Sequence, residues 1–243
     1  MGSNIFHFKV FSVRQNHAPM KVCTDSCLFG AWAANYIKIF SAGASKLLDI
    51  GTGTGLLSLM IAQQTKVQVS AVEIDEEALH DARYNFEHSP WQARIKIYHS
   101  PVQNFAEVPK KKFDLVICNP PFFSKSLNSP KEEKNLSKHE NNLPLETLIV
   151  HAKELLNEQG LFFLLLPADR DKELRKLIAV QNLFIKEVVT IHQTQSHTAF
   201  RKFYCIGTST TGAINEQTIF IKTNKENYSP EFIDLLKPYY LAL

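Results

Sequence analysis

The sequence predicts an α/β protein with a Rossmann-like, seven-stranded mixed sheet, helices on both faces and an antiparallel last strand. Short apolar runs alternate with helical segments through most of the 243 residues, which is typical of a parallel sheet covered on both sides. Only residues 193–199 separate the last two apolar runs. A parallel crossover needs about a dozen residues or more, so we expect the final strand to be antiparallel.

The individual elements follow from these runs in chain order. Lys46–Ile50 indicates a short buried strand, and the glycine turn after it leads into an amphipathic helix that begins at Leu56. Val67–Val72 is a second apolar strand, and Phe113–Cys118 must end before two prolines that cannot donate to a sheet ladder. We expect strands near 46–50, 67–73, 94–98, 113–118, 160–166, 184–192 and 200–210, and helices near 26–40, 55–64, 76–88, 144–157, 170–181 and after Ser229.

The glycine turn after the first of these strands predicts a place where the backbone approaches a ligand. An acid, Asp49, comes just before the turn, and Glu73 ends the next strand, about 20 residues on, where a carboxylate can accept both hydroxyls of a ribose. The spacing Gly-x-Gly-x-Gly differs from the dinucleotide fingerprint, and the Asp49 carboxylate would repel a pyrophosphate but attract an ammonium group. The sequence therefore favours S-adenosylmethionine over NAD. The candidate cofactor-binding residues here are Asp49, Gly51, Thr52, Gly53, Gly55, Glu73 and Ile74.

The turn Asn119-Pro120-Pro121-Phe122 places an amide, rigid carbonyl groups and an aromatic ring at the exit of a strand. The Pro120 carbonyl has no ladder partner and can accept a hydrogen bond from a ligand. Two prolines alone would fit a plain strand-terminating turn, but all four residues after an apolar strand indicate a site that grips a planar amine. Asn119, Pro120, Pro121 and Phe122 are therefore the candidate catalytic residues, and Asn119 is also a candidate cofactor contact.

These two motifs together resemble the class I S-adenosylmethionine-dependent methyltransferases that methylate an exocyclic nitrogen and carry an Asn-Pro-Pro-aromatic motif. Flanking segments look like the bacterial tRNA1(Val) adenine-N6 methyltransferases, namely Phe8–Gln15, Met20–Trp32, Ser89–Trp91, Ser126–Pro130 and Lys138-His139. The resemblance covers nearly the whole chain, up to about Thr211. It implies an enzyme whose cofactor is S-adenosylmethionine and whose partner is tRNA, with the target adenosine at position 37 beside the anticodon.

The chemistry of adenine suggests roles for the catalytic turn. The N6 lone pair is delocalised into the ring, so the Asn119 side-chain oxygen and the Pro120 carbonyl would each accept one N6–H and direct the lone pair towards the methyl group. Phe122 would stack on the base. No strong general base is needed, and the adenine must be flipped out or lie in an unpaired loop, as an anticodon-loop base does.

The composition fits a single domain, residues 1–243. The resemblance implies an N-terminal lid at about 1–40, and the segment after the catalytic turn is expected to be a substrate loop at about 123–142. A hydrophobic content of 44% is enough for one large core. Four cysteines, no signal peptide and no membrane-spanning apolar run indicate a reduced, cytoplasmic protein. No further metal ligands accompany Cys23 and Cys27 at a recognisable spacing, so we expect no metal. The sequence does not indicate an oligomeric state, and we assume a monomer.

The net charge of +3 and the pI of about 8.6 neither require nor exclude a nucleic-acid partner. Basic residues gather in residues 1–22 and 124–139. Because the second segment leaves the catalytic turn directly, we expect it to contact substrate phosphates, although His139 also fits a plain surface residue. The candidate substrate-binding residues are Phe122, Phe123, Lys125, Lys131, Lys138 and His139.

Three further positions concern the cofactor. Lys21 and Thr24 precede the first long helix, where Thr24 could equally be an ordinary N-cap, and the resemblance implies a lid role for both. Relatives usually carry an Asp after the third strand that bonds the cofactor's adenine amine, but this chain has Pro101 in that region. We therefore expect apolar contacts, backbone groups or Gln103 to hold the adenine.

Other functions fit parts of the same pattern. An Asn-Pro-Pro-aromatic motif can also hold a DNA adenine, a ribosomal RNA guanine or a protein glutamine amide. From a different class, a nicotinamide oxidoreductase or a catalytically silent nucleotide-binding module would also use a glycine-rich turn.

Overall fold

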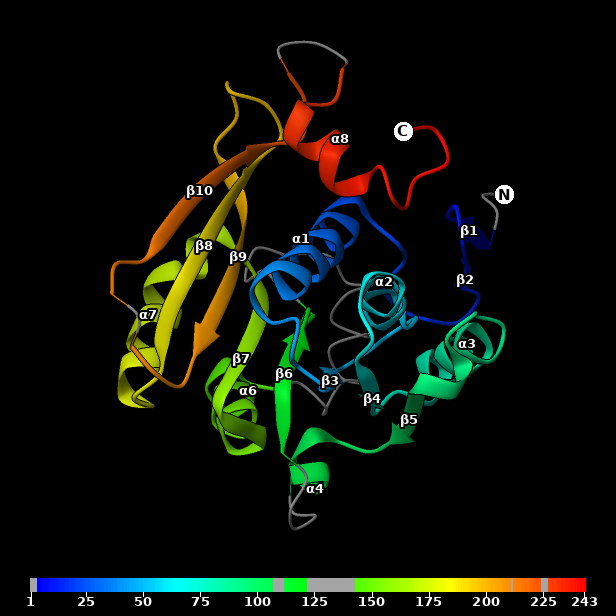
Figure 1. Ribbon diagram of the computed structural model, residues 1–243, viewed down its shortest axis with the longest axis horizontal. Helices are drawn as coiled ribbons and strands as arrows, with labels where there is room; N and C mark the ends of the chain where they lie inside the picture. Colours follow the sequence, from blue (N-terminus) through cyan, green and yellow to red (C-terminus); the bar gives the residue numbers. More distant parts are fainter. Residues whose placement is uncertain (1–3, 107–111, 122–142, 211, 224–226) are drawn as a thin grey trace, which may run out of the picture.

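The core of the protein is an eight-stranded sheet in the order β10-β8-β9-β7-β6-β3-β4-β5 (Figure 1). The computed structural model describes residues 4–106, 112–121, 143–210, 212–223 and 227–243. The strands of this sheet are β3 (Lys46–Ile50), β4 (Gln68–Glu73), β5 (Ile95–His99), β6 (Phe113–Cys118), β7 (Leu156–Pro167), β8 (Phe184–His192), β9 (Ala199–Gly207) and β10 (Asn215–Phe220). A separate antiparallel hairpin pairs β1 (Ile5–His7) with β2 (Ser12–Arg14).

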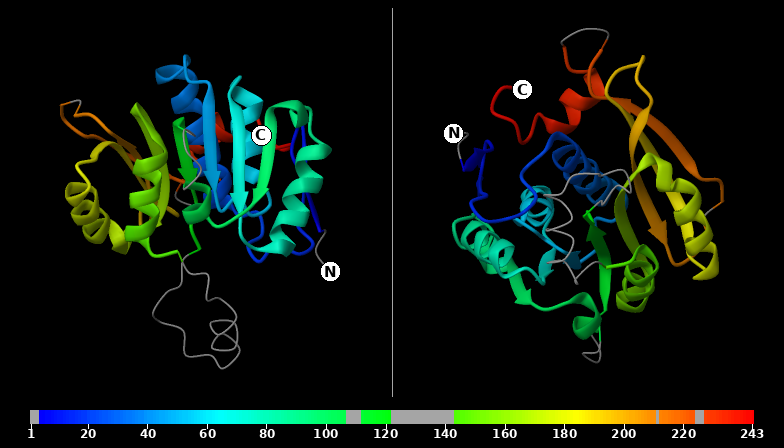
Figure 2. Two further views of the ribbon diagram at one scale, coloured as in Figure 1. Left: turned by 90° about the horizontal axis from the view of Figure 1, so that it is seen from below. Right: turned by 180° about the vertical axis from the view of Figure 1, so that it is seen from behind.

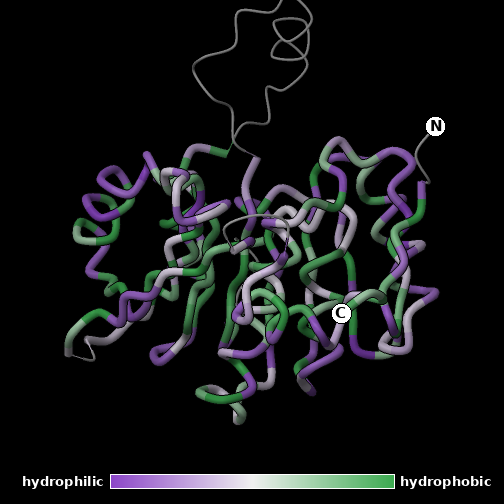
Figure 3. Tube along the Cα trace, turned by 90° about the horizontal axis from the view of Figure 1, so that it is seen from above, coloured by the Kyte–Doolittle hydropathy of each residue, from purple (hydrophilic) through white to green (hydrophobic). Residues whose placement is uncertain are grey.

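Helices cover both faces of the sheet because its central strands are apolar on both sides (Figure 2). In β6, Leu115 and Ile117 face one core, and Val116 and Cys118 face the other. The first core is closed by α1 (Thr24–Phe40), α2 (Leu56–Gln64), α3 (Glu76–Glu87) and α8 (Pro230–Leu236), and the second by α4 (Val102–Ala106), α6 (Leu145–Leu155) and α7 (Asp171–Val180). Figure 3 shows the hydrophobic residues gathered along the strands between these two layers.

The predicted α/β class is confirmed, and β9 is antiparallel to both of its neighbours, β7 and β8, as expected. The strand count of seven is too low by one. β10 follows β9 and pairs with β8 in parallel, so the last strand in chain order is not antiparallel. This edge strand escaped prediction because its first four residues are exposed and its sequence, Asn-Glu-Gln-Thr-Ile-Phe, has no apolar run.

Smaller differences occur in short elements. The β1–β2 hairpin and α4 were not predicted, since three-residue strands and a five-residue helix carry little periodic signal. β7 begins at Leu156 instead of near residue 160, directly after α6 ends at Leu155. Within the described residues, no helix has the length and apolarity required to cross a membrane.

Candidate active site

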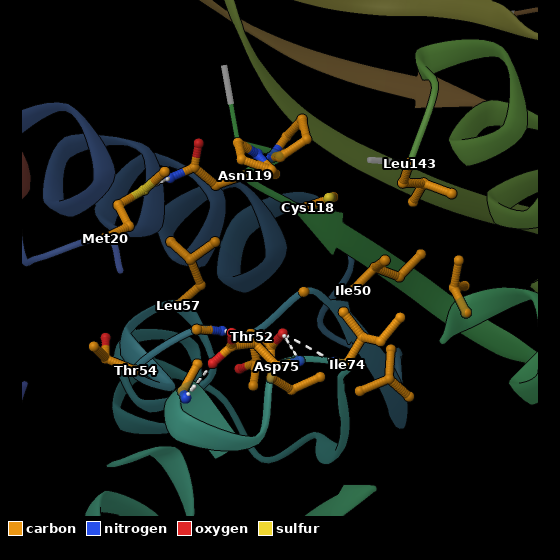
Figure 4. Close-up of a pocket in the computed structure, with 18 of the residues that line it drawn as sticks. Met20, Ile50, Thr52, Thr54, Leu57, Ile74, Asp75, Cys118, Asn119 and Leu143 are labelled. Atoms are coloured by element: carbon orange, nitrogen blue, oxygen red, sulfur yellow. Dashed lines mark hydrogen bonds between the residues drawn. The ribbon is translucent and has the colours of Figure 1, made fainter. Parts of the chain in front are cut away.

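An open cavity of about 570 Å³ lies at the edge of the sheet where β3, β4 and β6 end. Parallel pairing sets Ile50 level with Val72 on one side and with Cys118 on the other, so the loops after these strands meet at one place. A volume of this size is typical of small-molecule sites. The lining residues, many of them drawn in Figure 4, are Pro19, Met20, Lys21, Val22, Ser26, Ile50, Gly51, Thr52, Gly53, Thr54, Leu56, Leu57, Val72, Glu73, Ile74, Asp75, Ala78, Ser100, Pro101, Val102, Gln103, Asn104, Cys118, Asn119, Pro120, Pro121 and Leu143.

The glycine turn after β3 forms the floor of this cavity. Its φ angles are +65° at Gly51, +57° at Gly53 and +82° at Gly55, a region that side chains rarely adopt. A Cβ atom at Gly55 would overlap the ring of Phe86, whereas one at Gly51 or Gly53 would meet nothing within 4 Å. Gly55 therefore allows α2 to pack against α3, and only Gly51 and Gly53 leave open backbone along the cavity.

Glu73 at the end of β4 is tied to this turn. Its Oε2 accepts from the backbone N–H of Gly53 at 2.8 Å, and its Oε1 accepts from the N–H groups of Ile74 and Asp75 at 2.9 and 3.0 Å. Burial raises the pKa of the Glu73 carboxyl above its ordinary value even though these three N–H groups lower it. The side chain is 7% exposed, and it presents two oriented acceptor oxygens to the cavity.

Asp49 lies beneath the turn and is not among the cavity's lining residues. Its side chain is fully buried, and Oδ2 accepts from the hydroxyls of Thr52 and Ser58, both at 2.7 Å. Oδ1 has no hydrogen-bond partner among the described residues. Asp49 can therefore act on a bound cation through its field and through Thr52, without forming part of the wall, and its role in cofactor binding stays a prediction.

The raised pKa of the Asp49 carboxyl makes the stability of the folded protein depend on pH. Burial raises its pKa from 3.8 to about 6, against the lowering effect of Thr52 and Ser58 and with a further increase from Glu73. Because the folded state binds this proton more tightly than the unfolded state, stability is lost as the pH rises from 4 towards 7, by about 3 kcal/mol. We expect Asp49→Asn to lack this loss. Urea unfolding of the ligand-free proteins should therefore show the stability of the variant increasing relative to that of the wild type from pH 4 to 7.

Asp114→Asn serves as a control of opposite sign. Hydrogen bonds from Ser45, Lys46 and Asn157 outweigh burial and lower the pKa of Asp114, so this carboxylate stabilises the fold at neutral pH and loses that effect on acidification. A stability difference between Asp49→Asn and the wild type that stays constant from pH 4 to 7 would contradict the assignment.

The catalytic turn predicted from the sequence lies on the opposite wall, at the end of β6. Asn119, Pro120 and Pro121 all line the cavity. The Asn119 side-chain nitrogen donates to the Ser26 hydroxyl at 2.9 Å and faces the Met20 sulfur at 3.7 Å. Its Oδ1 is buried and has no hydrogen-bond partner among the described residues, so it is an acceptor available to a ligand.

Residues 14–22, called here the N-terminal segment, supply a third wall through Pro19, Met20, Lys21 and Val22. The fully buried Asp81 of α3 accepts from Arg14 Nε and from the backbone N–H groups of His17 and Ala18, at 2.7 to 3.0 Å. These contacts connect the wall to α3.

Asn85, one turn further along α3, joins the N-terminal segment to the glycine turn. Its Oδ1 accepts from Arg14 N, and its Nδ2 donates to the carbonyl oxygens of Arg14 and Thr54. Sequence reasoning missed Asp81 and Asn85, because polar residues inside an amphipathic helix do not reveal their partners.

The structure brings together most of the predicted site residues that it describes. Lys21, Gly51, Thr52, Gly53, Glu73, Ile74 and Gln103 line the same cavity as the catalytic turn. Thr24 is an exposed first residue of α1, and neither it nor Gly55 lines the cavity. The remaining candidates, Phe122, Phe123, Lys125, Lys131, Lys138 and His139, lie outside the described residues, and their roles stay predictions.

Cys118 borders the cavity, but it is not suited to act as a nucleophile. Burial, with Asp49 and Glu73 nearby, raises the pKa of this thiol well above its ordinary value. A neutral thiol is a weak nucleophile. Across the described part of the chain, no group of three or more His, Cys, Asp or Glu residues could hold a metal ion.

Comparisons with known proteins agree with the geometry. Residues 34–198 match the family model of the methyltransferase small domain. The chain is 35% identical over 240 residues to a protein of Flavobacterium psychrophilum named tRNA1(Val) (adenine(37)-N6)-methyltransferase, covering 98% of this chain and 100% of the relative. A protein of the same name from Dyadobacter fermentans is 38% identical over 240 residues, 97% of each chain.

Solved structures share the fold at low sequence identity. A protein of Agrobacterium tumefaciens described as an O-methyltransferase superposes with a TM-score of 0.66 at 17% identity, over 87% of this chain and 95% of its own. A protein described as a methyltransferase, in complex with S-adenosylhomocysteine, superposes with a TM-score of 0.60 at 16% identity, over 85% of this chain and 57% of its own.

Proposed function

This chain belongs to the methyltransferase small domain family, alongside the tRNA1(Val) (adenine(37)-N6)-methyltransferases, and we propose that it methylates N6 of an adenosine in tRNA, at position 37 of tRNA1(Val). The observation that carries this proposal is the full-length similarity to relatives of that name, at 35% and 38% identity. The cofactor is S-adenosylmethionine, which supplies a methyl group bound to a positively charged sulfur.

The cavity has the features that such a cofactor requires. Glu73 would accept the ribose hydroxyls chiefly at Oε2, which accepts from one backbone N–H and has a lone pair left, whereas Oε1 already accepts from two. The open backbone at Gly51 and Gly53 would border the amino-acid end of the cofactor. The buried Oδ1 of Asp49, for which the described residues supply no hydrogen-bond partner, makes that end favourable for an ammonium group.

We assign the lining residues Lys21 and Gln103 to the two ends of the same cofactor. The exposed Lys21 ammonium, which donates to the Gln15 carbonyl at 3.1 Å, would face the cofactor's carboxylate. Gln103 would face the adenine, beside the lining residue Pro101. Ile74, which is 37% exposed in the ligand-free protein, would cover the base with apolar surface.

Asn119 would act on the acceptor. Its Oδ1 would accept one N6–H of the adenine, and the Pro120 carbonyl would accept the other, which orients the nitrogen lone pair out of the ring plane. Both acceptors also stabilise the positive charge that develops on nitrogen as the new bond forms. The proton then leaves through Asn119 or water, without a strong general base.

We propose that the protein acts in the cytoplasm, where tRNA is found. We also propose that it is a monomer of one domain, residues 1–243, with an N-terminal lid at about 1–40 and a substrate loop at about 123–142. A target in the anticodon loop would need no duplex opening, since its bases are unpaired.

The test is mass spectrometry of nucleosides from tRNA1(Val) before and after incubation with the protein and S-adenosylmethionine. We expect one N6-methyladenosine per tRNA at position 37, and none in a transcript whose position 37 is guanosine. A parallel incubation with tritiated cofactor uses total tRNA, ribosomal RNA, DNA and protein fractions. Label that appears only outside the tRNA fraction would reject the proposal.

A further inference from the structure

The side-chain amide of Asn119 is oriented by contacts to its nitrogen. Its nitrogen has two neighbours from the chain before β3, the Ser26 hydroxyl at 2.9 Å and the Met20 sulfur at 3.7 Å. Figure 4 shows the nitrogen turned towards Met20 and the oxygen turned away from it. Both N–H groups therefore have acceptors, while Oδ1 has no partner among the described residues.

This arrangement defines which end of the amide is oxygen. A thioether sulfur has no hydrogen to donate, so it can only accept from the atom that faces it. Turning the amide by 180° would set Oδ1 against the sulfur and would leave the N–H groups without these acceptors. The contacts of the nitrogen thus select the rotamer in which the carbonyl oxygen stays available.

Ser26 is the stronger of the two acceptors, because a hydroxyl oxygen forms better hydrogen bonds than a thioether. It lies in the first turn of α1, is 5% exposed and lines the same cavity. Its Oγ also lies 3.0 Å from Cys23 Sγ. Burial, with Asp25 nearby, raises the pKa of the Cys23 thiol to about 11. When the Ser26 hydroxyl donates its proton to the Cys23 sulfur, its oxygen can only accept from Asn119 and has no proton to offer to the amide oxygen.

We propose that Ser26 is a positioning residue for methyl transfer, which holds the Asn119 amide with its oxygen directed to the acceptor amine. This inference rests on the proposed function and adds to it a residue of α1, 93 positions away from Asn119 in the sequence. Ser26 has no direct contact with the reacting atoms in this proposal. Its loss would let the amide rotate, so that a fraction of molecules presents N–H groups where an acceptor is needed.

The test compares Ser26→Ala with the wild type in single-turnover methylation of tRNA1(Val). We expect the methyl-transfer rate to fall by roughly 10- to 100-fold, since misorientation of a reacting group costs on that order. The affinity for S-adenosylhomocysteine and the melting temperature should stay close to those of the wild type. Ser26→Thr, which keeps a hydroxyl, should recover most of the rate, and Ser26→Cys, a weaker acceptor, should be intermediate.

Ser89→Ala is the matched control. Ser89 is also 5% exposed, and its hydroxyl donates to the Phe86 carbonyl at the end of α3, away from the cavity lining. We expect its methyl-transfer rate to equal that of the wild type. Met20→Leu preserves volume and removes the second acceptor, so it should lower the rate less than Ser26→Ala does and should lower it further in combination.

Two outcomes would overturn the inference. A Ser26→Ala rate within twofold of the wild type would show that the hydroxyl does not orient the amide. An equal loss of rate and of S-adenosylhomocysteine affinity would make Ser26 a cofactor contact. Both outcomes require that the wild-type enzyme methylates tRNA. If the proposed function is wrong, the wild type itself leaves tRNA unmodified, so the two kinds of failure can be distinguished.

Discussion

Asn119→Ala is expected to lower the rate of methyl transfer by at least about 10³-fold and to leave the affinity for S-adenosylhomocysteine within a few-fold of the wild type. The Asn119 Oδ1 is a buried acceptor that has no hydrogen-bond partner within the described parts of the chain, on the wall of the cavity opposite Glu73. Removing one oriented group that stabilises developing charge typically costs about 10²–10³ in rate. Loss of amine orientation adds to this. Single-turnover kinetics and calorimetry measure the two quantities separately.

Asn157→Ala provides the matched control. Asn157 is likewise an amide that donates to another side chain, its Nδ2 to Asp114 Oδ1 at 2.6 Å, but it is not among the residues that line the cavity. This variant should keep the wild-type rate. If Asn119→Ala lost cofactor affinity as strongly as it lost rate, Asn119 would be a cofactor residue instead.

Glu73→Gln is expected to weaken S-adenosylmethionine binding by at least about 100-fold, although glutamine has nearly the same shape. Hydrogen bonds to a charged acceptor contribute about 1.5–3 kcal/mol each, and the proposed ribose contacts number two. The glutamine amide also cannot accept all the backbone hydrogen bonds that the Glu73 carboxylate accepts. Either orientation sets an NH2 group against a backbone N–H, of Gly53 on one side or of Ile74 and Asp75 on the other.

Glu76→Gln tests whether this loss is specific. Glu76 is an exposed residue in the first turn of α3, three positions beyond Glu73, and does not line the cavity. Calorimetry should give this variant the wild-type dissociation constant. Wild-type affinity in Glu73→Gln would show that the ribose is held elsewhere and would remove Glu73 from the proposed site.

Much of the architecture could be predicted because the relevant signals are local. The apolar runs of β3, β4 and β6 and the glycines and prolines that follow them lie next to one another in the sequence, and parallel strands bring their carboxyl ends to one edge. β10 could not be found in this way. Its polar residues form a strand because β8 offers an edge to pair with, which is a property of the folded sheet.

The amino-acid order alone was enough for the fold class, the cofactor cavity and the turn Asn119-Pro120-Pro121, because residue type and short spacing specify strand ends and tight turns. Folding decided the orientation of the site's polar groups. Asp49 turns under the glycine loop to Ser58, and Ser26 reaches Asn119 from α1. The physical reason is that a hydrogen bond depends on distance and direction between two groups, and the packing of α1 and α2 against the sheet sets both.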